Sequence, residues 1–317
     1  MSINKTNETV IITGGTGLIG SRLCQLLHEK GYRTIVLSRN TPSGISTSAN
    51  DKSLVSFWNP EKGIIDESLI NQADYIIHLA GANIGESRWT LKRKQLIQNS
   101  RTEPAKFILE TIKKRRNKIK AFITASAIGY YGSVTSNKIF TETDQPAQDF
   151  LGETCNKWEA AADEFETLGI RTVKIRTGMV LSKEQGALSK MKLPAKFGIS
   201  ASFGNGKQYL PWIHIDDLCL IYIQAIQNSN MKGPFNAVAP QHVTNKEFNG
   251  SIIRFYKKTF IKTSIPAFLL RIILGEMSDI LLKGSRISSD KICLTGYKFR
   301  YPELHSALKN LLGGKTI

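Results

Sequence analysis

Four glycines within seven residues make residues 13–20 the clearest candidate for a binding site in this sequence. The stretch reads TGGTGLIG, follows the apolar run TVII and precedes a pattern with apolar residues on one helical face. The spacing Gly15-x-Gly17-x-x-Gly20 allows a sharp backbone turn and brings backbone N–H groups close to a phosphate, and the helix N-terminus adds partial positive charge. The sequence therefore predicts a loop that binds the diphosphate of a dinucleotide. The alternative is a glycine-rich turn that only packs the helix on the strand.

The residues that follow these glycines by about 20 positions indicate which dinucleotide is bound. An acidic residue there would bind the ribose hydroxyls of NAD(H), but the sequence reads Ser38-Arg39-Asn40. A guanidinium suits the additional 2′-phosphate of NADP(H). The sequence therefore favours NADP(H) over NAD(H) as the cofactor, and the alternative for Arg39 is a surface arginine without a ligand.

Strand and helix patterns alternate along the first half of the chain. Short apolar runs predict strands, and patterns with one apolar face predict helices between them. The predicted strands span 9–14, 33–39, 54–59, 73–81, 120–127 and 171–181, and the predicted helices span 18–31, about 91–114 with a kink or break at Pro104, and 152–169. This alternation predicts an α/β fold, a Rossmann-type doubly wound parallel sheet with helices on both faces.

The pattern changes after residue 181 and becomes mostly helical and basic from residue 243 onward. We expect residues 1–178 plus 211–240 to form an NADP-binding Rossmann domain. Residues 179–210 plus 241–317 should form a smaller, mainly helical substrate or C-terminal lobe over the C-terminal edge of the sheet.

Several motifs together resemble the extended short-chain dehydrogenase/reductases. They are TGGTGLIG, IIHLAGANI, SAIGYYG, the pair Trp158-Glu159, RTGMVL and WIHIDDL. The chain is most similar to an atypical, epimerase-like subgroup (nucleoside-diphosphate-sugar epimerase-like), and its tail resembles the small C-terminal domain of unknown function found there. The resemblance implies that these residues hold the cofactor: Thr13, Gly14, Gly15, Thr16, Gly17, Leu18, Ile19 and Gly20 at the diphosphate, Ser38 and Arg39 at the adenosine phosphate, and Leu79, Ala80 and Gly81 beside it.

One part of the family pattern is absent. Ordinary members of the superfamily carry a Tyr-x-x-x-Lys pair on the helix after the fifth strand, where the lysine lowers the tyrosine pKa so that the phenolate acts as a base. Here these positions hold Leu151 and Cys155 or, in another register, Glu153 and Lys157.

Three hydroxyl groups nearby are the candidates for proton transfer. The resemblance places the residue that polarises a substrate carbonyl in SAIGYYG, where Ala127 stands at its position and Ser126 precedes it. Tyr130 and Tyr131 follow the predicted fifth strand, near the expected nicotinamide position. We therefore predict Ser126, Tyr131 and Tyr130 as catalytic residues, with water as the alternative.

Two histidines and two aspartates have simpler interpretations. His78 lies within a predicted buried strand, where packing or a hydrogen bond is expected rather than acid–base chemistry. His214 and Asp216 resemble a catalytic pair, but we expect Asp216 or Asp217 to cap the following helix.

The remaining observations concern partners and location. The net charge is +17, but no zinc-finger or RNA-binding motif is present, so we expect no specific nucleic-acid partner. No apolar run approaches the roughly 20 residues of a spanning helix, the polar start shows no secretory signal, and the four cysteines are scattered. We expect a cytoplasmic protein with reduced thiols, no metal site and no membrane partner, and a homodimer is left open.

Three functions fit these observations, the third being a nucleic-acid or anionic-surface binder driven by the basic surface. The first is an NADP(H)-binding, epimerase-like oxidoreductase that acts on an unidentified small carbonyl or hydroxyl substrate. The second is a non-catalytic regulator or scaffold that senses NADP(H), which would account for the absent Tyr-x-x-x-Lys pair.

Overall fold

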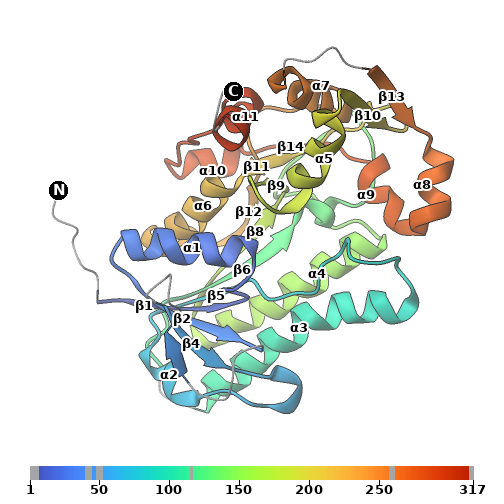
Figure 1. The fold of residues 1–317 in the computed structure, drawn as a ribbon. Helices are drawn as coiled ribbons and strands as arrows, with labels where there is room; N and C mark the ends of the chain where they lie inside the picture. The colour runs from blue at the N-terminus through green and yellow to red at the C-terminus, as the bar shows by residue number, and fades with distance from the viewer. Residues whose placement is uncertain (1–6, 40–44, 48–52, 115–116, 257–260, 314–317) are drawn as a thin grey trace.

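A central sheet of mostly parallel strands organises the computed structural model, which describes residues 7–39, 45–47, 53–114, 117–256 and 261–313 (Figure 1). The strand order is β12-β8-β6-β5-β1-β2-β4-β3, and only β3 runs antiparallel to its neighbour among the described strands. From β1 the chain extends outward through β2 and β4, and from β5 it extends the other way through β6, β8 and β12. The strand order therefore reverses between β1 and β5, where open α/β sheets bind ligands beyond the carboxyl ends of their strands.

The described strands are β1 (Thr9–Thr13), β2 (Arg33–Ser38), β3 (Ile45–Thr47), β4 (Leu54–Phe57), β5 (Tyr75–His78), β6 (Ala121–Ala127), β7 (Ile139–Phe140), β8 (Arg171–Thr177), β9 (Met179–Leu181), β10 (Ile199–Phe203), β11 (Trp212–His214), β12 (Gly233–Ala237), β13 (Ile261–Ile265) and β14 (Arg286–Ile287). The α-helices are α1 (Leu18–Glu29), α2 (Glu67–Gln72), α3 (Leu91–Lys113), α4 (Phe150–Asp163), α5 (Gly186–Lys196), α6 (Ile215–Gln227), α7 (Asn245–Phe255), α8 (Ala267–Leu274), α9 (Asp279–Leu282), α10 (Asp290–Leu294) and α11 (Leu304–Leu312). Short 3₁₀ segments are η1 (Pro60–Lys62), η2 (Ile128–Tyr131), η3 (Glu164–Leu168) and η4 (Gly275–Ser278).

The period-two geometry of the strands divides their side chains between two cores. Val10 and Ile12 of β1 pack in the core shared with α1 and α6, and Ile11 packs in the core shared with α3 and α4. The neighbouring strands alternate in the same way, so both faces of the sheet are covered (Figure 1). The predicted Rossmann-type fold with helices on both faces is confirmed.

One local prediction is wrong, and one of the two alternatives of another is excluded. The strand predicted over 171–181 is divided into β8 and β9, because Gly178 turns the chain where a Cβ would lie 2.7 Å from the Pro211 carbonyl oxygen. Strand β9 then pairs with β11 instead of the central sheet. Of the kink or break predicted at Pro104, the break is absent, since α3 continues through Pro104, and the kink stays a prediction.

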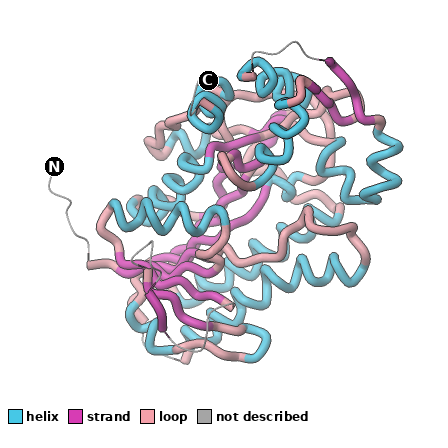
Figure 2. The backbone as a smooth tube through the Cα atoms, in the orientation of Figure 1, coloured by secondary structure: helices cyan, strands magenta, loops and turns pink. Residues whose placement is uncertain are grey.

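The C-terminal portion is largely helical and lies beyond one end of the central sheet (Figures 1 and 2). Its apolar core brings together α5, α7, α11 and the β9–β11 pair, with Trp212, Phe248 and Leu308 fully buried. A second two-stranded sheet, β10–β13, adjoins α5 and α7. Among the described residues, no helix combines the length and the apolar character needed to cross a bilayer.

Candidate functional site

The glycine loop joins β1 to α1 at the point where the strand order reverses. Gly14 has a φ of +70°, and a Cβ there would lie 2.9 Å from the backbone nitrogen of Ala80 in the loop after β5. At Gly20 a Cβ would lie 2.4 Å from the Gly14 carbonyl oxygen, so α1 can pack this closely only with glycine. The predicted residues 13–20 and 79–81 therefore form one surface at the carboxyl ends of β1 and β5.

The N-terminus of α1 is open toward solvent. Gly17 is the N-cap residue and offers no side chain to accept the first N–H groups of the helix. Thr16 and Gly17 are exposed, and with Leu18 and Arg22 they border a cavity of about 230 Å³. Such a helix start attracts anions through its unpaired N–H groups and its dipole.

The opposite wall of this cavity is a loop that sequence reasoning missed. It consists of residues 182–185 and brings both the ammonium group of Lys183 and the carboxylate of Glu184 to the cavity. Arg22 also lines the cavity, but its Nε donates to Asp216 Oδ1 at 2.7 Å, which raises the pKa of Arg22. No spacing rule links residue 183 to the glycine loop, since only the fold brings them together.

His78 fixes the geometry between the two loops. Its Nε2 donates to the Arg101 carbonyl oxygen at 3.3 Å, so its Nδ1 accepts a hydrogen bond from the Thr13 hydroxyl at 2.7 Å. The Thr13 oxygen in turn accepts from the Ala80 N–H at 3.3 Å. The expected structural role of this buried histidine is therefore supported by its contacts.

His78 should make the stability of the fold depend on pH. Burial lowers its pKa to about 4, against an ordinary value of 6.5, so the unfolded chain binds more protons between these values. Its contribution is complete above pH 6.5 and is lost as the pH falls toward 4, a change on the order of 3 kcal/mol. Urea unfolding across this range should show a shallower pH slope for His78→Gln than for the unchanged protein.

The exposed His305 provides the matched control. Replacement of His305 by glutamine should leave the pH slope unchanged, because this ring is exposed on α11. Equal slopes for the unchanged protein and His78→Gln would show that His78 is not the group responsible.

Arg101 is a second residue that the sequence did not reveal. Its guanidinium donates to the carbonyl oxygens of Ala82 and Ile97 at 3.0 and 2.8 Å. It also lies 3.3 Å from where a Gly81 Cβ would be. These hydrogen bonds to Ala82 and Ile97 therefore connect the loop after β5 to α3. Burial lowers the pKa of Arg101 from its ordinary value.

Ser38 and Arg39 occupy the carboxyl end of β2, the neighbour of β1. Ser38 is buried, and Arg39 follows it as an exposed side chain. A guanidinium at this edge is accessible to a ligand that extends sideways from the glycine loop. The predicted phosphate contact itself stays a prediction.

A buried polar network occupies the carboxyl ends of β6, β8 and β12. Glu159 of α4 accepts from the Ser126 hydroxyl at 2.7 Å and from Arg176 Nε and Nη2 at 2.8 and 2.9 Å. Arg176 Nη1 also donates to the Tyr131 hydroxyl at 3.0 Å, and that hydroxyl donates to Asn236 Oδ1 at 2.7 Å. The network is therefore a bidentate ion pair with a hydroxyl group on each side.

The charges of this network are strongly coupled. Burial opposes the charge on Arg176, but the hydrogen bonds and charge of Glu159 outweigh it and raise the arginine pKa above its ordinary value. Burial raises the pKa of Tyr131 to about 12, so its phenol is neutral near pH 7.

Tyr130 differs from its neighbour in accessibility. Its ring lies over the Arg176 guanidinium, 3.4 Å from the guanidinium carbon to the ring centroid, and the residue is only partly buried, whereas Tyr131 is 3% exposed. Burial raises the pKa of Tyr130 as well. Of the three predicted catalytic residues, Tyr130 is the one with a partly open side chain, and the catalytic roles stay predictions.

The two registers of the absent Tyr-x-x-x-Lys pair differ in where their residues lie on α4, and the choice between them stays a prediction. A Cβ at Gly129 of η2 would lie 3.4 Å from Leu151 Cβ and 3.6 Å from Cys155 Sγ, so these two residues face η2. Glu153 and Lys157 are exposed on another side of α4. Burial raises the pKa of Cys155 to about 12, and the thiol is therefore neutral near pH 7.

The capping prediction for α6 is wrong. His214 is the N-cap residue, and its Nδ1 accepts the Asp216 N–H at 3.0 Å. Asp217 instead accepts from the N–H groups of Arg300 and Tyr301 at 2.8 and 2.9 Å, which ties the C-terminal segment to α6. The Asp217 carboxylate therefore binds N–H groups that are distant in the sequence and does not cap α6.

Comparison with protein-family models identifies two regions. Residues 10–238 match the NAD dependent epimerase/dehydratase family, and residues 265–311 match a domain of unknown function, DUF1731. The chain is 36% identical over 307 residues to the epimerase family protein YfhF of Bacillus subtilis (strain 168), covering 96% of this chain and 98% of the relative.

Solved structures show the same similarity. The human epimerase family protein SDR39U1 (isoform 2), crystallised with NADPH, has a TM-score of 0.83 at 30% identity and covers 97% of this chain and 100% of its own. A nucleoside-diphosphate sugar epimerase from Corynebacterium glutamicum has a TM-score of 0.77 at 30% identity, over 98% of this chain and 59% of its own.

Proposed function

Because the chain belongs to the NAD-dependent epimerase/dehydratase family, in its short-chain dehydrogenase/reductase-like epimerase group with a C-terminal DUF1731 domain, we propose that it is an NADP(H)-dependent, epimerase-like oxidoreductase. Its substrate is proposed to be a small carbonyl or hydroxyl compound held between the sheet edge and the C-terminal lobe. We further propose the domain division at 1–178 plus 211–240 and 179–210 plus 241–317, and a cytoplasmic location.

The single observation that carries this proposal is the cradle at residues 13–20. A Cβ at Gly14 or Gly20 would collide with backbone atoms, and the first N–H groups of α1 face an open cavity. These features suit a diphosphate, and Lys183 offers an ammonium group at the same cavity, beside the carboxylate of Glu184. The crystallised human relative contains NADPH and is similar along nearly the whole chain, which supports the same cofactor here.

The bound dinucleotide supplies the hydride acceptor or donor, and the polypeptide must supply binding, orientation and a proton. Ser126 and Tyr131 are engaged with Glu159 and Asn236, so they are proposed to hold the wall of the site rigid. Tyr130 is proposed to donate the proton from its phenol, since its ring is partly open and braced by Arg176. A neutral phenol suits donation better than it suits a base.

Oxidation of NADPH with a panel of carbonyl compounds tests this function. Tyr130→Phe should lower kcat by about 100-fold with the panel member that is turned over, the usual size of a lost general acid, and should leave NADPH affinity unchanged. Tyr256→Phe, at the end of α7, serves as the control and should keep full activity. An unchanged kcat in Tyr130→Phe would show that Tyr130 is not the proton donor.

The cofactor preference is tested separately at Arg39. Arg39→Ala should weaken NADPH binding about tenfold or more and leave NADH binding nearly unchanged, because only NADPH carries the 2′-phosphate. Arg33 lies at the other end of the same strand, so Arg33→Ala should affect neither nucleotide. Calorimetric titration measures both affinities, and a preference of the unchanged protein for NADH would overturn the assignment.

A non-catalytic NADP(H) sensor is the second candidate. It is favoured by the Leu151 and Cys155 side chains at the positions of the Tyr–Lys pair, and by the neutral, hydrogen-bonded state of Tyr131. Firm NADPH binding without turnover of any panel member would support this function over the enzymatic one.

A further inference from the structure

Helix α8 exposes large apolar side chains that its own fold leaves uncovered. The exposed fractions are 60% for Phe268, 39% for Leu269, 66% for Ile272 and 63% for Ile273, and Leu270 is buried. We call these four exposed side chains the α8 face. Contiguous apolar surface of this kind marks an interaction site, whereas exposed apolar residues that stand singly need no explanation.

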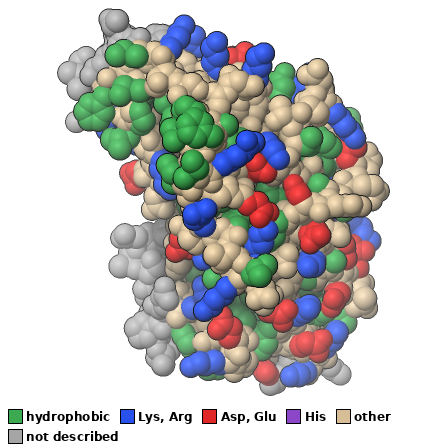
Figure 3. All heavy atoms as spheres, turned by 90° about the vertical axis from the view of Figure 1, so that its right-hand side faces the viewer, with side chains coloured by type: hydrophobic (Ala, Val, Ile, Leu, Met, Phe, Trp, Pro, Cys, Tyr) green, Lys and Arg blue, Asp and Glu red, His purple; other side chains and the backbone are tan. Residues whose placement is uncertain are grey.

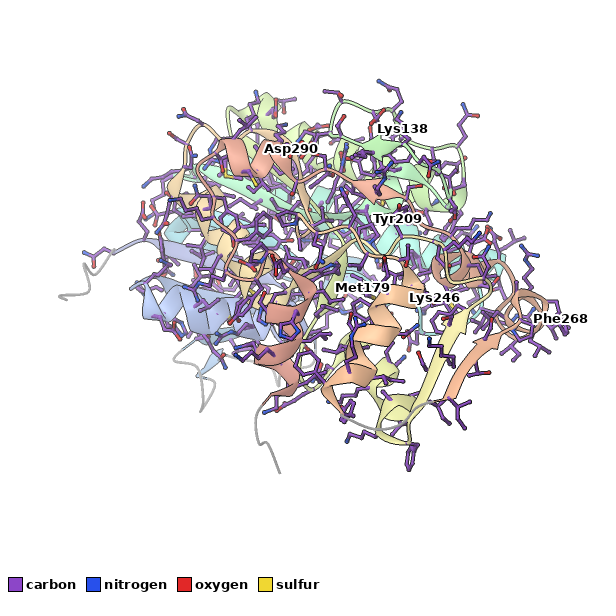
Figure 4. All side chains as sticks on the ribbon, turned by 90° about the horizontal axis from the view of Figure 1, so that it is seen from above. Lys138, Met179, Tyr209, Lys246, Phe268 and Asp290 are labelled. Carbon is purple, nitrogen blue, oxygen red and sulfur yellow. The ribbon has the colours of Figure 1, made fainter. Side chains whose placement is uncertain are left out.

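The α8 face is a continuous stripe. Residues separated by four positions lie above one another on a helix, so 268 and 272, and 269 and 273, form two adjacent rows. Figure 4 shows Phe268 at the outer edge of the molecule, whereas Met179 and Tyr209 lie toward the middle of this view. Figure 3 shows hydrophobic and basic side chains together on this side of the molecule.

The surroundings of the face are basic. Residues 261–273 contain Lys262 and Arg271 and no acidic residue. The next two acids, Glu276 and Asp279, pair with Lys94 and Lys283 at 2.6 and 2.9 Å. Across residues 179–210 and 241–317, 18 Lys and Arg stand against six Asp and Glu, so this third of the chain carries 12 of the 17 net positive charges.

We propose that the α8 face docks on the surface of an anionic lipid bilayer. The apolar side chains enter the boundary between headgroups and acyl chains, and the basic residues around them attract the negative headgroups. A second copy of the chain fits less well, because it would bring two strongly positive lobes together. This interfacial mode needs no spanning segment, and it departs from the sequence-based expectation of no membrane partner.

The test is sedimentation of the full-length protein with phosphatidylcholine vesicles that contain or lack phosphatidylglycerol. The protein should bind the anionic vesicles, bind pure phosphatidylcholine weakly, and be released by high salt. The double variant Ile272→Ser/Ile273→Ser should bind anionic vesicles at least about tenfold more weakly. Both positions are largely exposed, so this variant should fold, as its NADPH affinity and circular dichroism will show.

Leu294→Ser is the matched control, because Leu294 is 86% exposed but lies on α10, outside the α8 face. It should bind vesicles like the unchanged protein. Absence of binding to anionic vesicles, or equal binding by the double variant, overturns the proposal. A third outcome also overturns it: the unchanged protein is a dimer that does not bind vesicles, and the double variant is a monomer. The α8 face would then be a contact between two copies of the chain.

Discussion

Replacement of Gly17 by glutamate should weaken NADPH binding at least about 100-fold, because a like charge placed in a charge-complementary site costs several kcal/mol. Gly17 is exposed at the N-terminus of α1, where the cradle would receive the diphosphate. The new carboxylate would occupy that position and repel the ligand. Calorimetric titration with NADPH measures the effect.

The fold should tolerate this substitution. Gly17 has a φ of −80°, which any residue adopts, and a Cβ there would approach only the Gly14 carbonyl oxygen at 3.3 Å. Thermal unfolding of Gly17→Glu should therefore stay close to that of the unchanged protein. Gly250→Glu adds the same charge on α7, where a Cβ meets no atom within 4 Å, and should leave NADPH affinity unchanged. If the folded Gly17→Glu variant keeps its NADPH affinity, NADPH does not bind at this loop.

Replacement of Arg176 by methionine should have the largest effect on stability, lowering the free energy of unfolding by about 3–5 kcal/mol. Arg176 is 2% exposed and pairs with the equally buried Glu159 through two hydrogen bonds. Without the guanidinium, the Glu159 carboxylate would stay buried without its counter-charge. The Tyr131 hydroxyl would also lose a donor. Urea unfolding measures the change.

Two further variants separate the charge effect from the loss of packing. Arg176→Met combined with Glu159→Leu should recover much of the loss, because replacing a whole buried pair with apolar side chains is far less costly than removing one partner. Lys120→Met breaks a surface pair with Glu8, in which the lysine side chain is 52% exposed, and should cost less than about 1 kcal/mol. Equal losses in the single and double variants would mean that the uncompensated charge is not the cause.

The fold could be predicted from the sequence because its signals are local. Runs such as Thr9–Thr13 are apolar on both faces, and helical patterns follow several of the strands, which together define a parallel sheet. The break at Gly178 was missed because it depends on the close approach of Pro211, which lies 33 positions further along the chain. The sequence left a kink or a break open at Pro104, and α3 continues through this proline.

The only part of the candidate site that could be predicted is the part formed by one short stretch of the chain. The glycine loop carries its own spacing, whereas Lys183 and Arg101 reach the site through the fold and follow no local rule. The network of Ser126, Glu159 and Arg176 is similar: its hydrogen bonds join residues 17 and 33 positions apart. Because these partners are distant in the sequence, it does not show that the hydroxyl groups predicted to be catalytic are hydrogen-bonded in the structure.

The central claim, that the backbone between residues 13 and 20 binds a dinucleotide diphosphate, is tested most directly by a crystal structure of the protein grown with NADPH. In that crystal structure, diphosphate oxygens should lie within hydrogen-bond distance of the N–H groups in the first turn of α1, with Lys183 beside the same cavity. Nucleotide bound at another place, with the loop filled by the protein's own atoms, would contradict it.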